Sequence, residues 1–314
     1  MGLKVDSGST FRPIGGVVEV EVRPPWPYRL PAYGGEDGVM RARGGVLSRL
    51  LHVDGSPVLV RAWQPSAERV LLRAEPVDPG AVAAPCPSAA PLAGPAGADQ
   101  LELAIERMRF ALAVDDDLDE FHRCFRGDPL LGPLLRRRPY FRARRRPWPW
   151  EALAWAVVKQ LIETGKAARI QRRIVGRWGA RLGAERGALH DVPDPAAIAG
   201  RAPAELESMG LALRRAIALR AVAREVAQGR CDPAEPAADR RLLAVREIGP
   251  WTVQCLGLLG RGDPDCLPAG DLMYIKLVGR LARLGRRATV EEVEDFYAPY
   301  APFRGLAAAL TAAA

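Results

Sequence analysis

The stretch from Arg241 to Lys276 constrains the fold most, because two apolar helical segments in it are separated by a very short turn. The first segment runs into Glu247-Ile248-Gly249-Pro250, and the second starts at Trp251. Gly249 can take a positive φ at little cost, and Pro250 fits the first turn of a new helix. The pattern predicts a helix, a tight hairpin and a second helix, whose N-terminal N–H groups offer a seat for one phosphate.

A single carboxylate, Asp271, follows this hairpin after a loop rich in Gly, Asp and Pro. The apolar spacing behind it predicts that a further helix starts there. Asp is a favoured N-cap, so capping is one interpretation of Asp271. Asp263 and Asp265 stand in Gly-Asp-Pro-Asp, which is typical of turn formers. Periodicity alone favours an ordinary helical hairpin in an all-α core.

The same stretch resembles the helix-hairpin-helix DNA glycosylase superfamily, whose hairpin reads Leu-Pro-Gly-Ile-Gly-x-x-Thr-Ala and precedes a catalytic Asp. Here Ile248, Gly249, Pro250 and Thr252 match the second half of that hairpin, and Asp271 follows at a similar gap. Within the superfamily the chain is most similar to the alkylbase type, 3-methyladenine DNA glycosylase II. The resemblance implies a DNA-binding hairpin and a base excision repair activity on duplex DNA that contains damaged bases.

Composition narrows the class of protein. The 314 residues are 48% hydrophobic and 26% charged, as in globular proteins, and the net charge of +8 suits a polyanionic partner. An arginine-rich composition can also arise without any such partner. Five scattered cysteines without a CxxC pair, together with three histidines, predict no zinc site and no disulfide framework. No signal segment or membrane span is evident, so we expect a cytoplasmic, nucleoid-associated protein, and we expect it to be a monomer.

The N-terminal third differs from the rest of the chain in its pattern of apolar and polar residues. Short alternating segments, bounded by Gly, Asp or Pro, predict strands at 16–23, 39–43, 47–53, 57–63 and 69–75. Residues 80–97 predict a flexible connection, and 101–114 fits either a strand or a helix. From Asp115 onward the pattern is helical. We therefore predict an α+β protein with a β-rich domain at 1–110 and a helical helix-hairpin-helix glycosylase domain at 111–314.

Residues 136–150 form the densest mixture of basic and aromatic side chains. In one interpretation the arginines contact phosphates while Tyr140, Phe141 or Trp148 line a base pocket. In the other, this is a solvated loop whose aromatic side chains anchor it to the core.

The resemblance also assigns a duplex wedge. In the family a helix ends in Gln followed by an apolar residue, which fills the place of a flipped base. Gln160 and Leu161 occupy these positions at the end of the predicted helix 150–161. An aliphatic wedge holds an unstacked step open, at a cost of a few kcal/mol. The alternative is that Leu161 is a core residue at a helix end.

Glycosidic bond cleavage develops positive charge on the sugar, and a fixed carboxylate stabilises that charge and orients the attacking water. The resemblance gives this role to Asp271. We expect Trp251, Tyr274, Phe303, Tyr140 and Phe141 to line the base pocket, and Phe303 stands where the family has Trp. An aromatic face binds a cationic alkylated purine by cation–π attraction. Core packing is the other interpretation of Trp251.

Members that also nick the backbone carry a Lys at the position of Trp251, and no lysine lies between Lys166 and Lys276. We therefore predict a monofunctional glycosylase. No cysteine cluster for an iron–sulfur centre is present, and we expect no cofactor or metal beyond a monovalent cation at the hairpin. Glu247 stands where the family hairpin has Gly. This carboxylate favours the alternative that the chain is a non-catalytic or weakened DNA-binding protein; a glycosylase for another lesion is a third possibility.

Overall fold

The computed structural model describes residues 11–14, 16–83, 94–183 and 187–314. The chain forms two compact units. Residues 1–117 and 171–197 make up the sheet unit, and residues 118–170 and 198–314 make up the helical unit. A domain division between residues 110 and 111 stays a prediction, and it did not anticipate that 171–197 groups with the sheet.

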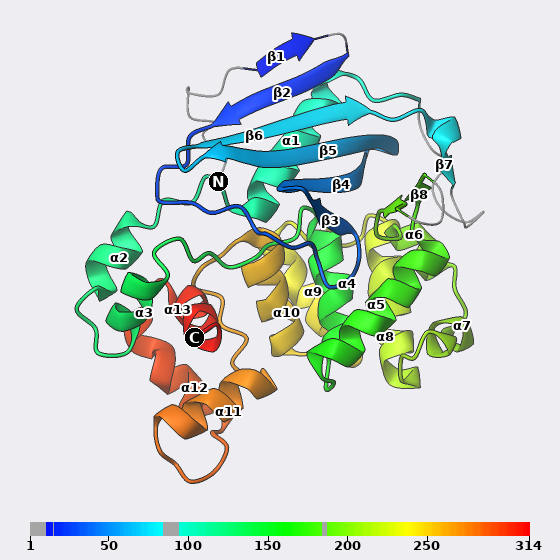
Figure 1. Ribbon diagram of the computed structural model, residues 1–314. Helices are drawn as coiled ribbons and strands as arrows, with labels where there is room; N and C mark the ends of the chain where they lie inside the picture. The colour runs from blue at the N-terminus through cyan, green and yellow to red at the C-terminus, as the bar shows by residue number, and fades with distance from the viewer. Residues whose placement is uncertain (1–10, 15, 84–93, 184–186) are drawn as a thin grey trace. The chain divides into compact units, whose positions relative to one another are not determined.

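Six strands of the sheet unit form one antiparallel sheet in the order β1-β2-β6-β5-β4-β3 (Figure 1). The predicted strands are confirmed, with ends shifted by up to three residues, and β1 was not anticipated. The strands are β1 (Phe11–Ile14), β2 (Val17–Val22), β3 (Met40–Arg43), β4 (Val46–Val53), β5 (Ser56–Ser66) and β6 (Arg69–Pro76).

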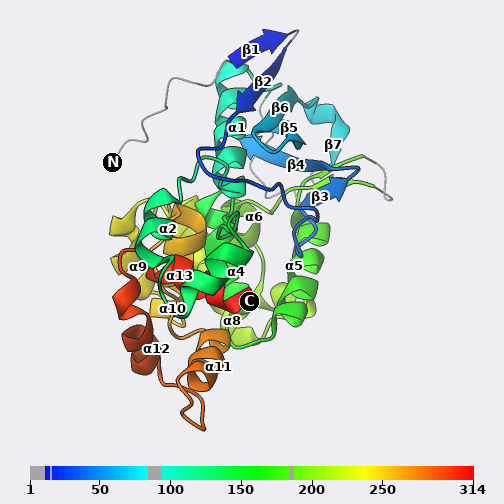
Figure 2. The ribbon, with the colours of Figure 1, turned by 60° about the vertical axis from the view of Figure 1, so that its left-hand side comes forward.

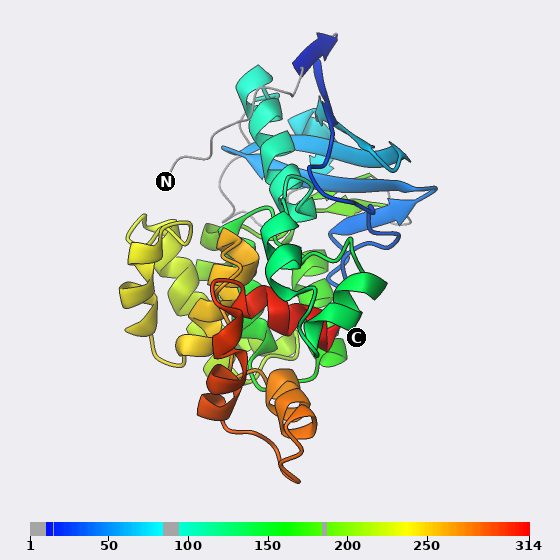
Figure 3. The same ribbon diagram turned by 90° about the vertical axis from the view of Figure 1, so that its left-hand side faces the viewer.

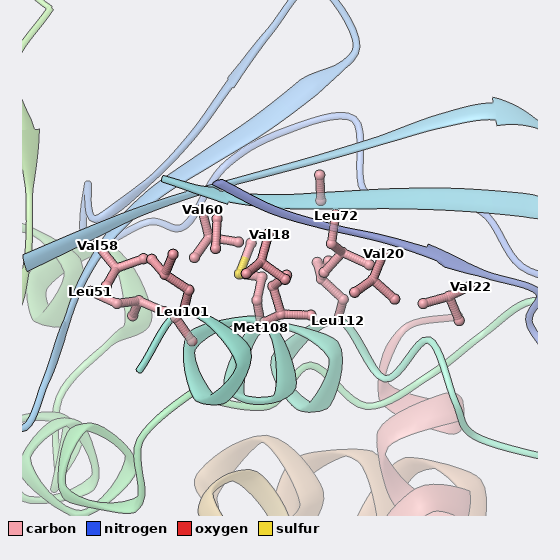
Figure 4. Packing of buried hydrophobic residues seen from close by; sticks show 14 of the residues in the cluster. Val18, Val20, Val22, Leu51, Val58, Val60, Leu72, Leu101, Met108 and Leu112 are labelled. Atoms are coloured by element: carbon pink, nitrogen blue, oxygen red, sulfur yellow. The ribbon is translucent and has the colours of Figure 1, made fainter. Parts of the chain in front are cut away.

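Helix α1 (Ala98–Leu112) packs on one face of this sheet (Figures 3 and 4). Its buried residues recur every three or four positions, which settles the ambiguous segment 101–114 as a helix. Every second residue of β2 is buried against α1, so the apolar face of the strand and the apolar face of the helix pack together in one layer. The side chains that Figure 4 labels in this layer include Val18, Val20, Leu72, Leu101, Met108 and Leu112.

A second sheet has three two-residue strands, β7 (Val82–Ala83), β8 (Arg181–Leu182) and β9 (Leu189–His190), in that order. The expectation of an entirely helical chain after Asp115 is therefore wrong for β8 and β9. Strands of two residues carry no readable period, and only pairing with a distant segment creates them. The 3₁₀ turn η1 (Pro79–Ala81) precedes β7, and residues 84–93 of the predicted connection lie outside the described residues.

The helical unit follows the predicted order of helices (Figure 2). Helices α5 and α6 each cross the division between the two units, at residues 170/171 and 197/198. The helices are α2 (Asp119–Phe125), α3 (Leu131–Arg137), α4 (Pro149–Lys159), α5 (Thr164–Trp178), α6 (Pro195–Ala199), α7 (Pro203–Ser208), α8 (Leu213–Ala227), α9 (Asp239–Leu243), α10 (Pro250–Leu256), α11 (Leu272–Leu281), α12 (Val290–Tyr297) and α13 (Arg304–Ala312), with 3₁₀ turns η2 (Pro236–Ala238) and η4 (Ala298–Tyr300) and a π-helical turn η3 (Gly257–Arg261). Among the described residues, no helix combines the length and apolar character needed to cross a bilayer.

Candidate glycosylase site

The hairpin joins α9 to α10, but its strained residue is not the expected glycine. Gly249 is extended, with φ −112° and ψ 179°, and serves as the N-cap of α10. The residue at positive φ is Glu247, with φ 69°. A residue with a Cβ pays roughly 1–2 kcal/mol for this left-handed conformation, so surrounding contacts must hold Glu247 there.

Two sets of contacts hold Glu247. Its carbonyl oxygen accepts a hydrogen bond from Gln160 Nε2 at 2.9 Å. Its carboxylate lies 3.8 Å from Arg214 Nη1 and 3.8 Å from Arg246 Nε, and both arginines are largely exposed. Two guanidinium groups thus offset the negative charge that Glu247 introduces into the hairpin.

Gln160 links the hairpin to the turn between α4 and α5. The same Nε2 also donates to Oγ1 of the buried Thr252, again at 2.9 Å. From the other side, Arg215 Nη1 donates to the carbonyl oxygens of Val158 and Gln160 at 3.0 and 3.1 Å. The end of α4 is therefore fixed by side chains from both the hairpin and α8.

Leu161 follows this anchored residue and projects fully into solvent, with a relative exposure of 103% and φ 55°. The interpretation of Leu161 as a core residue is wrong. A leucine loses hydrophobic stabilisation when it is exposed and also pays for a left-handed conformation. The structure thus holds an aliphatic side chain outward at a fixed turn, which is the geometry that a wedge requires.

Asp271 is the N-cap of α11, so the capping interpretation is confirmed. Its Oδ1 accepts from the backbone N–H of Met273 at 2.8 Å, and its Oδ2 accepts from Trp251 Nε1 at 3.3 Å. Both donors are neutral, and the side chain is partly exposed. The carboxylate is therefore oriented by two hydrogen bonds, while neither donor cancels its charge.

The charge of Asp271 acts on two buried groups, the Tyr274 phenol and the Cys255 thiol. Burial raises the pKa of the Tyr274 phenol, and the negative charge of Asp271 raises it further. Burial likewise raises the pKa of the Cys255 thiol, the charge of Asp271 adds to this, and the charge of Lys159 opposes it. Sequence reasoning missed Cys255 and Lys159, because they come from α10 and the end of α4 and share no motif with Asp271.

The other predicted pocket residues lie in different surroundings. The ring of Phe303 contacts those of Phe121 and Phe125, with centroid distances of 5.4 and 6.4 Å. The carbonyl oxygen of Tyr140 accepts from Arg142 Nη1, and the N–H of Phe141 donates to Arg138. Only Trp251 and Tyr274 are brought to Asp271 by these interactions. The pocket roles of Phe303, Tyr140 and Phe141 stay predictions.

The basic and aromatic loop after α3 is anchored at its end. Arg146 Nη1 lies 3.0 Å from a carboxylate oxygen of Glu151, whose side chain is completely buried. The N–H of Arg146 also donates to the carbonyl oxygen of Leu259. At least this arginine is structural, and the roles of the aromatic side chains of the loop stay predictions.

The turn after the hairpin matches expectation at Asp263, whose Oδ1 accepts from the N–H of Asp265 at 2.9 Å. Asp265 has a further role, because it accepts two hydrogen bonds from the Arg304 guanidinium and one from its N–H, at the start of α13. It thereby satisfies a backbone N–H in the first turn of α13. Among the described residues, no group of three or more His, Cys, Asp or Glu side chains is placed to hold a metal ion.

Comparison with known proteins agrees with this geometry. Residues 154–301 match the model of the HhH-GPD superfamily of base excision DNA repair proteins, a range that includes the Gln160–Leu161 turn, the hairpin and Asp271. A DNA-3-methyladenine glycosylase of Bacillus subtilis is 24% identical over 200 residues. The probable bifunctional transcriptional activator/DNA repair enzyme AlkA of Mycobacterium tuberculosis is 29% identical over 211 residues.

These alignments cover 62% and 66% of this chain, and they span 66% and 42% of the two relatives, which is less than two thirds of either. A 3-methyladenine DNA glycosylase structure from Archaeoglobus fulgidus shares the fold over 93% of this chain and 96% of its own. Its TM-score is 0.75 and its identity is 19%. By its fold and by the match over residues 154–301, which includes the hairpin, the Gln160–Leu161 turn and Asp271, the chain is similar to the HhH-GPD superfamily of base excision DNA repair proteins and, among them, to the alkylbase type.

Proposed function

We propose that the protein is a monofunctional DNA glycosylase that hydrolyses the N-glycosidic bond of alkylated purines, of the 3-methyladenine type, in duplex DNA. The observation that carries this proposal is the carboxylate of Asp271, which is oriented by the Met273 amide and the Trp251 indole. The names of the relatives support the same activity.

In the proposed reaction the bond between C1′ of the deoxyribose and the base nitrogen breaks, and its electron pair leaves with the base. Asp271 stabilises the positive charge that develops on the sugar. Water then bonds to C1′ and gives its proton to the Asp271 carboxylate, which leaves an abasic site. An N-alkylated purine is already cationic, so it departs as a neutral base without a general acid.

Leu161 supports the access step of this proposal. The target nucleotide must leave the base stack before its glycosidic bond can reach Asp271. An exposed leucine on a turn that is held by Gln160 and Arg215 is suited to enter the gap, because it does not need to be ordered on binding. The Trp251 face beside Asp271 would receive the cationic base.

The test is base release from duplex DNA that carries 3- or 7-methylpurines, revealed as strand breaks after heat or alkali. We expect release by the natural protein and a loss of about 100- to 1000-fold in Asp271→Asn. Asn also caps helices well, so this variant should keep its stability. Asp263→Asn is the matched control and should retain activity. If Asp271→Asn still releases the base, Asp271 is not the catalytic carboxylate.

The absence of lyase activity is a separate part of the proposal. Trp251 cannot form a Schiff base, so borohydride should trap no covalent complex and no strand break should precede alkali. A trapped complex would contradict the monofunctional assignment. Lys159 would then be the first amine to replace, because its charge acts on Cys255 in the same region.

Glu247 supports the alternative of a weakened or non-catalytic DNA-binding protein, because it places a carboxylate in the hairpin. Glu247→Gly separates the two cases. Glycine accepts the positive φ and removes the charge, so DNA affinity and base release should both rise if Glu247 is inhibitory. Salt-sensitive binding without release by either protein would support the binder. A monomeric state, a cytoplasmic location and a monovalent cation at the hairpin stay predictions.

A further inference from the structure

A strongly basic hollow lies at the end of α11 opposite Asp271. Its open volume is about 520 Å³, and it is lined by Lys276, Gly279, Arg280, Arg283, Gly285, Arg286 and Arg287. We call the five cationic residues of this set the basic cradle. They fall within a span of 12 residues, from the last turns of α11 into the loop before α12.

The loop that carries the cradle is fixed to the helix. The N–H of Ala288 donates to the carbonyl oxygen of Ile275 at 3.1 Å, and the N–H of Leu284 donates to that of Gly279 at 2.9 Å. A Cβ at Gly279 would overlap the carbonyl oxygen of Arg286, so this close return of the chain requires glycine there. The cradle therefore has its shape before any ligand arrives.

One of the five cations serves this loop structure. Arg286 makes two hydrogen bonds to Glu292, at 2.7 and 2.6 Å, while Glu292 also accepts from the N–H of Thr289 at the start of α12. The hydrogen bonds from Arg286 hold the pKa of Glu292 at about 2. This ion pair therefore persists at neutral pH and sets the position of the loop.

The remaining four cations have a different environment. Within the described parts of the chain, no carboxylate pairs with Lys276, Arg280, Arg283 or Arg287, and all four are exposed. Like charges held this close repel one another, and a polyanion relieves that repulsion on binding. Guanidinium groups in a preformed hollow suit the oxygens of a phosphodiester.

The cradle lies where a bound duplex can reach it. Asp271 and Arg280 are nine residues apart along the helix, and the rise over nine helical residues is about 14 Å. This is roughly the length of four base pairs of DNA. The loop after α11 and the turn between α4 and α5 both lie toward the lower edge of the helical unit in Figures 1 and 3.

We propose that the basic cradle binds backbone phosphates of the DNA about three to five nucleotides from the lesion, as an anchoring site separate from the hairpin. This inference rests on the proposed function for its choice of duplex DNA. The site makes no base contacts, so it raises affinity for damaged and undamaged duplexes alike.

The test compares two triple variants. Arg280→Gln, Arg283→Gln and Arg287→Gln remove three cradle charges and spare Arg286. Arg43→Gln, Arg177→Gln and Arg224→Gln are the matched control, because these arginines are exposed and make no ion pair to the described residues. Each triple variant lowers the net charge from +8 to +5. Thermal unfolding checks that both remain folded, and an Arg→Lys triple variant of the cradle should bind as the natural protein does.

Binding to a duplex with an uncleavable abasic analogue is measured as a function of salt. Each lost phosphate contact reduces the slope of log K against log salt by about 0.9, so the cradle variant should lose about 2–3 and the control little. Equal slopes for the two variants would overturn the cradle. A neutral methylphosphonate stepped along each strand should weaken binding of the natural protein three to five positions from the lesion, and the cradle variant should lose that sensitivity.

Base release measured separately distinguishes the two proposals. Normal release by both variants at saturating protein, with equal salt slopes, would overturn the cradle and leave the glycosylase. A shallower slope for the cradle variant without any base release by the natural protein would support the cradle and overturn the glycosylase. A natural protein that does not bind duplex DNA would overturn both.

Discussion

Asp191 of the sheet unit and Asp271 of the helical unit are both aspartates that accept from a backbone N–H and a ring N–H, yet their surroundings differ. Asp191 is buried and accepts from the N–H and Nδ1 of His52, from the N–H of Val192 and from Arg49. Asp271 accepts from one amide and one indole and is partly exposed.

This difference separates a structural carboxylate from a candidate catalytic one. Inside the sheet unit, Arg49 neutralises the charge of Asp191, and both carboxylate oxygens of Asp191 accept hydrogen bonds. The charge of Asp271 is oriented by neutral donors and stays available to a cation that develops nearby. Hydrogen bonding alone does not mark a catalytic aspartate; exposure and the charge of its partners do.

The largest effects are expected when each of the two aspartates is replaced in turn. Asp191→Ala should lower the free energy of unfolding by about 3–5 kcal/mol, because it removes a carboxylate that offsets the buried charge of Arg49. Asp271→Asn should change the free energy of unfolding by less than about 1 kcal/mol while it abolishes most base release. Urea unfolding and single-turnover base release on both variants check this pair. A stable Asp191→Ala protein would show that the buried ion pair is dispensable.

The same comparison applies to two leucines. Leu72 is fully buried in the sheet unit, and Leu72→Ala should cost about 2–5 kcal/mol of unfolding free energy. Leu161→Ala should change stability by no more than about 0.5 kcal/mol, since the side chain touches solvent only. Base release should nevertheless fall in Leu161→Ala, and more for a well-paired lesion than for a mismatched one. Equal rates for Leu161→Ala and the natural protein would contradict the wedge.

A smaller effect is expected at Gln160. Gln160→Leu removes both hydrogen bonds to the hairpin and leaves the carbonyl oxygen of Glu247 without that donor, at a cost of about 1–2 kcal/mol. If Gln160 positions Leu161, the variants Gln160→Leu and Leu161→Ala should not add in base release. Full additivity in the double variant would show that the hairpin and the wedge turn act independently.

The smallest expected effect is the pH dependence of the sheet unit. Burial alone would raise the pKa of Asp191, but the hydrogen bond and charge of His52 and the charge of Arg49 hold it below its ordinary value of 3.8. The stabilisation by Asp191 is therefore complete above that value and is lost as the pH falls below it. The difference in unfolding free energy between the natural protein and Asp191→Ala should therefore shrink as the pH falls below about 4, and a constant difference would refute the assignment.

Much of the fold could be predicted because its signals are local. Five strands follow from alternation, and the helices around the hairpin follow from apolar spacing and from Pro and Asp at their starts. Strands β8 and β9 could not be predicted, since they exist only through pairing with β7. The left-handed conformation was expected to suit Gly249 but lies at Glu247, because contacts from Gln160 and the flanking arginines override intrinsic preference.

The sequence by itself determined the resemblance to the helix-hairpin-helix glycosylases and the candidates Asp271, Trp251, Gln160 and Leu161, because a motif records residue type and spacing. Only the tertiary structure decided that Leu161 stands in solvent, that the Trp251 indole donates to Asp271 and that Gln160 joins two segments 87 residues apart. It also decided that five basic residues after Asp271 line one hollow. The reason is physical: exposure, hydrogen bonding and charge neutralisation depend on which distant groups the fold brings into contact, and no local pattern encodes them.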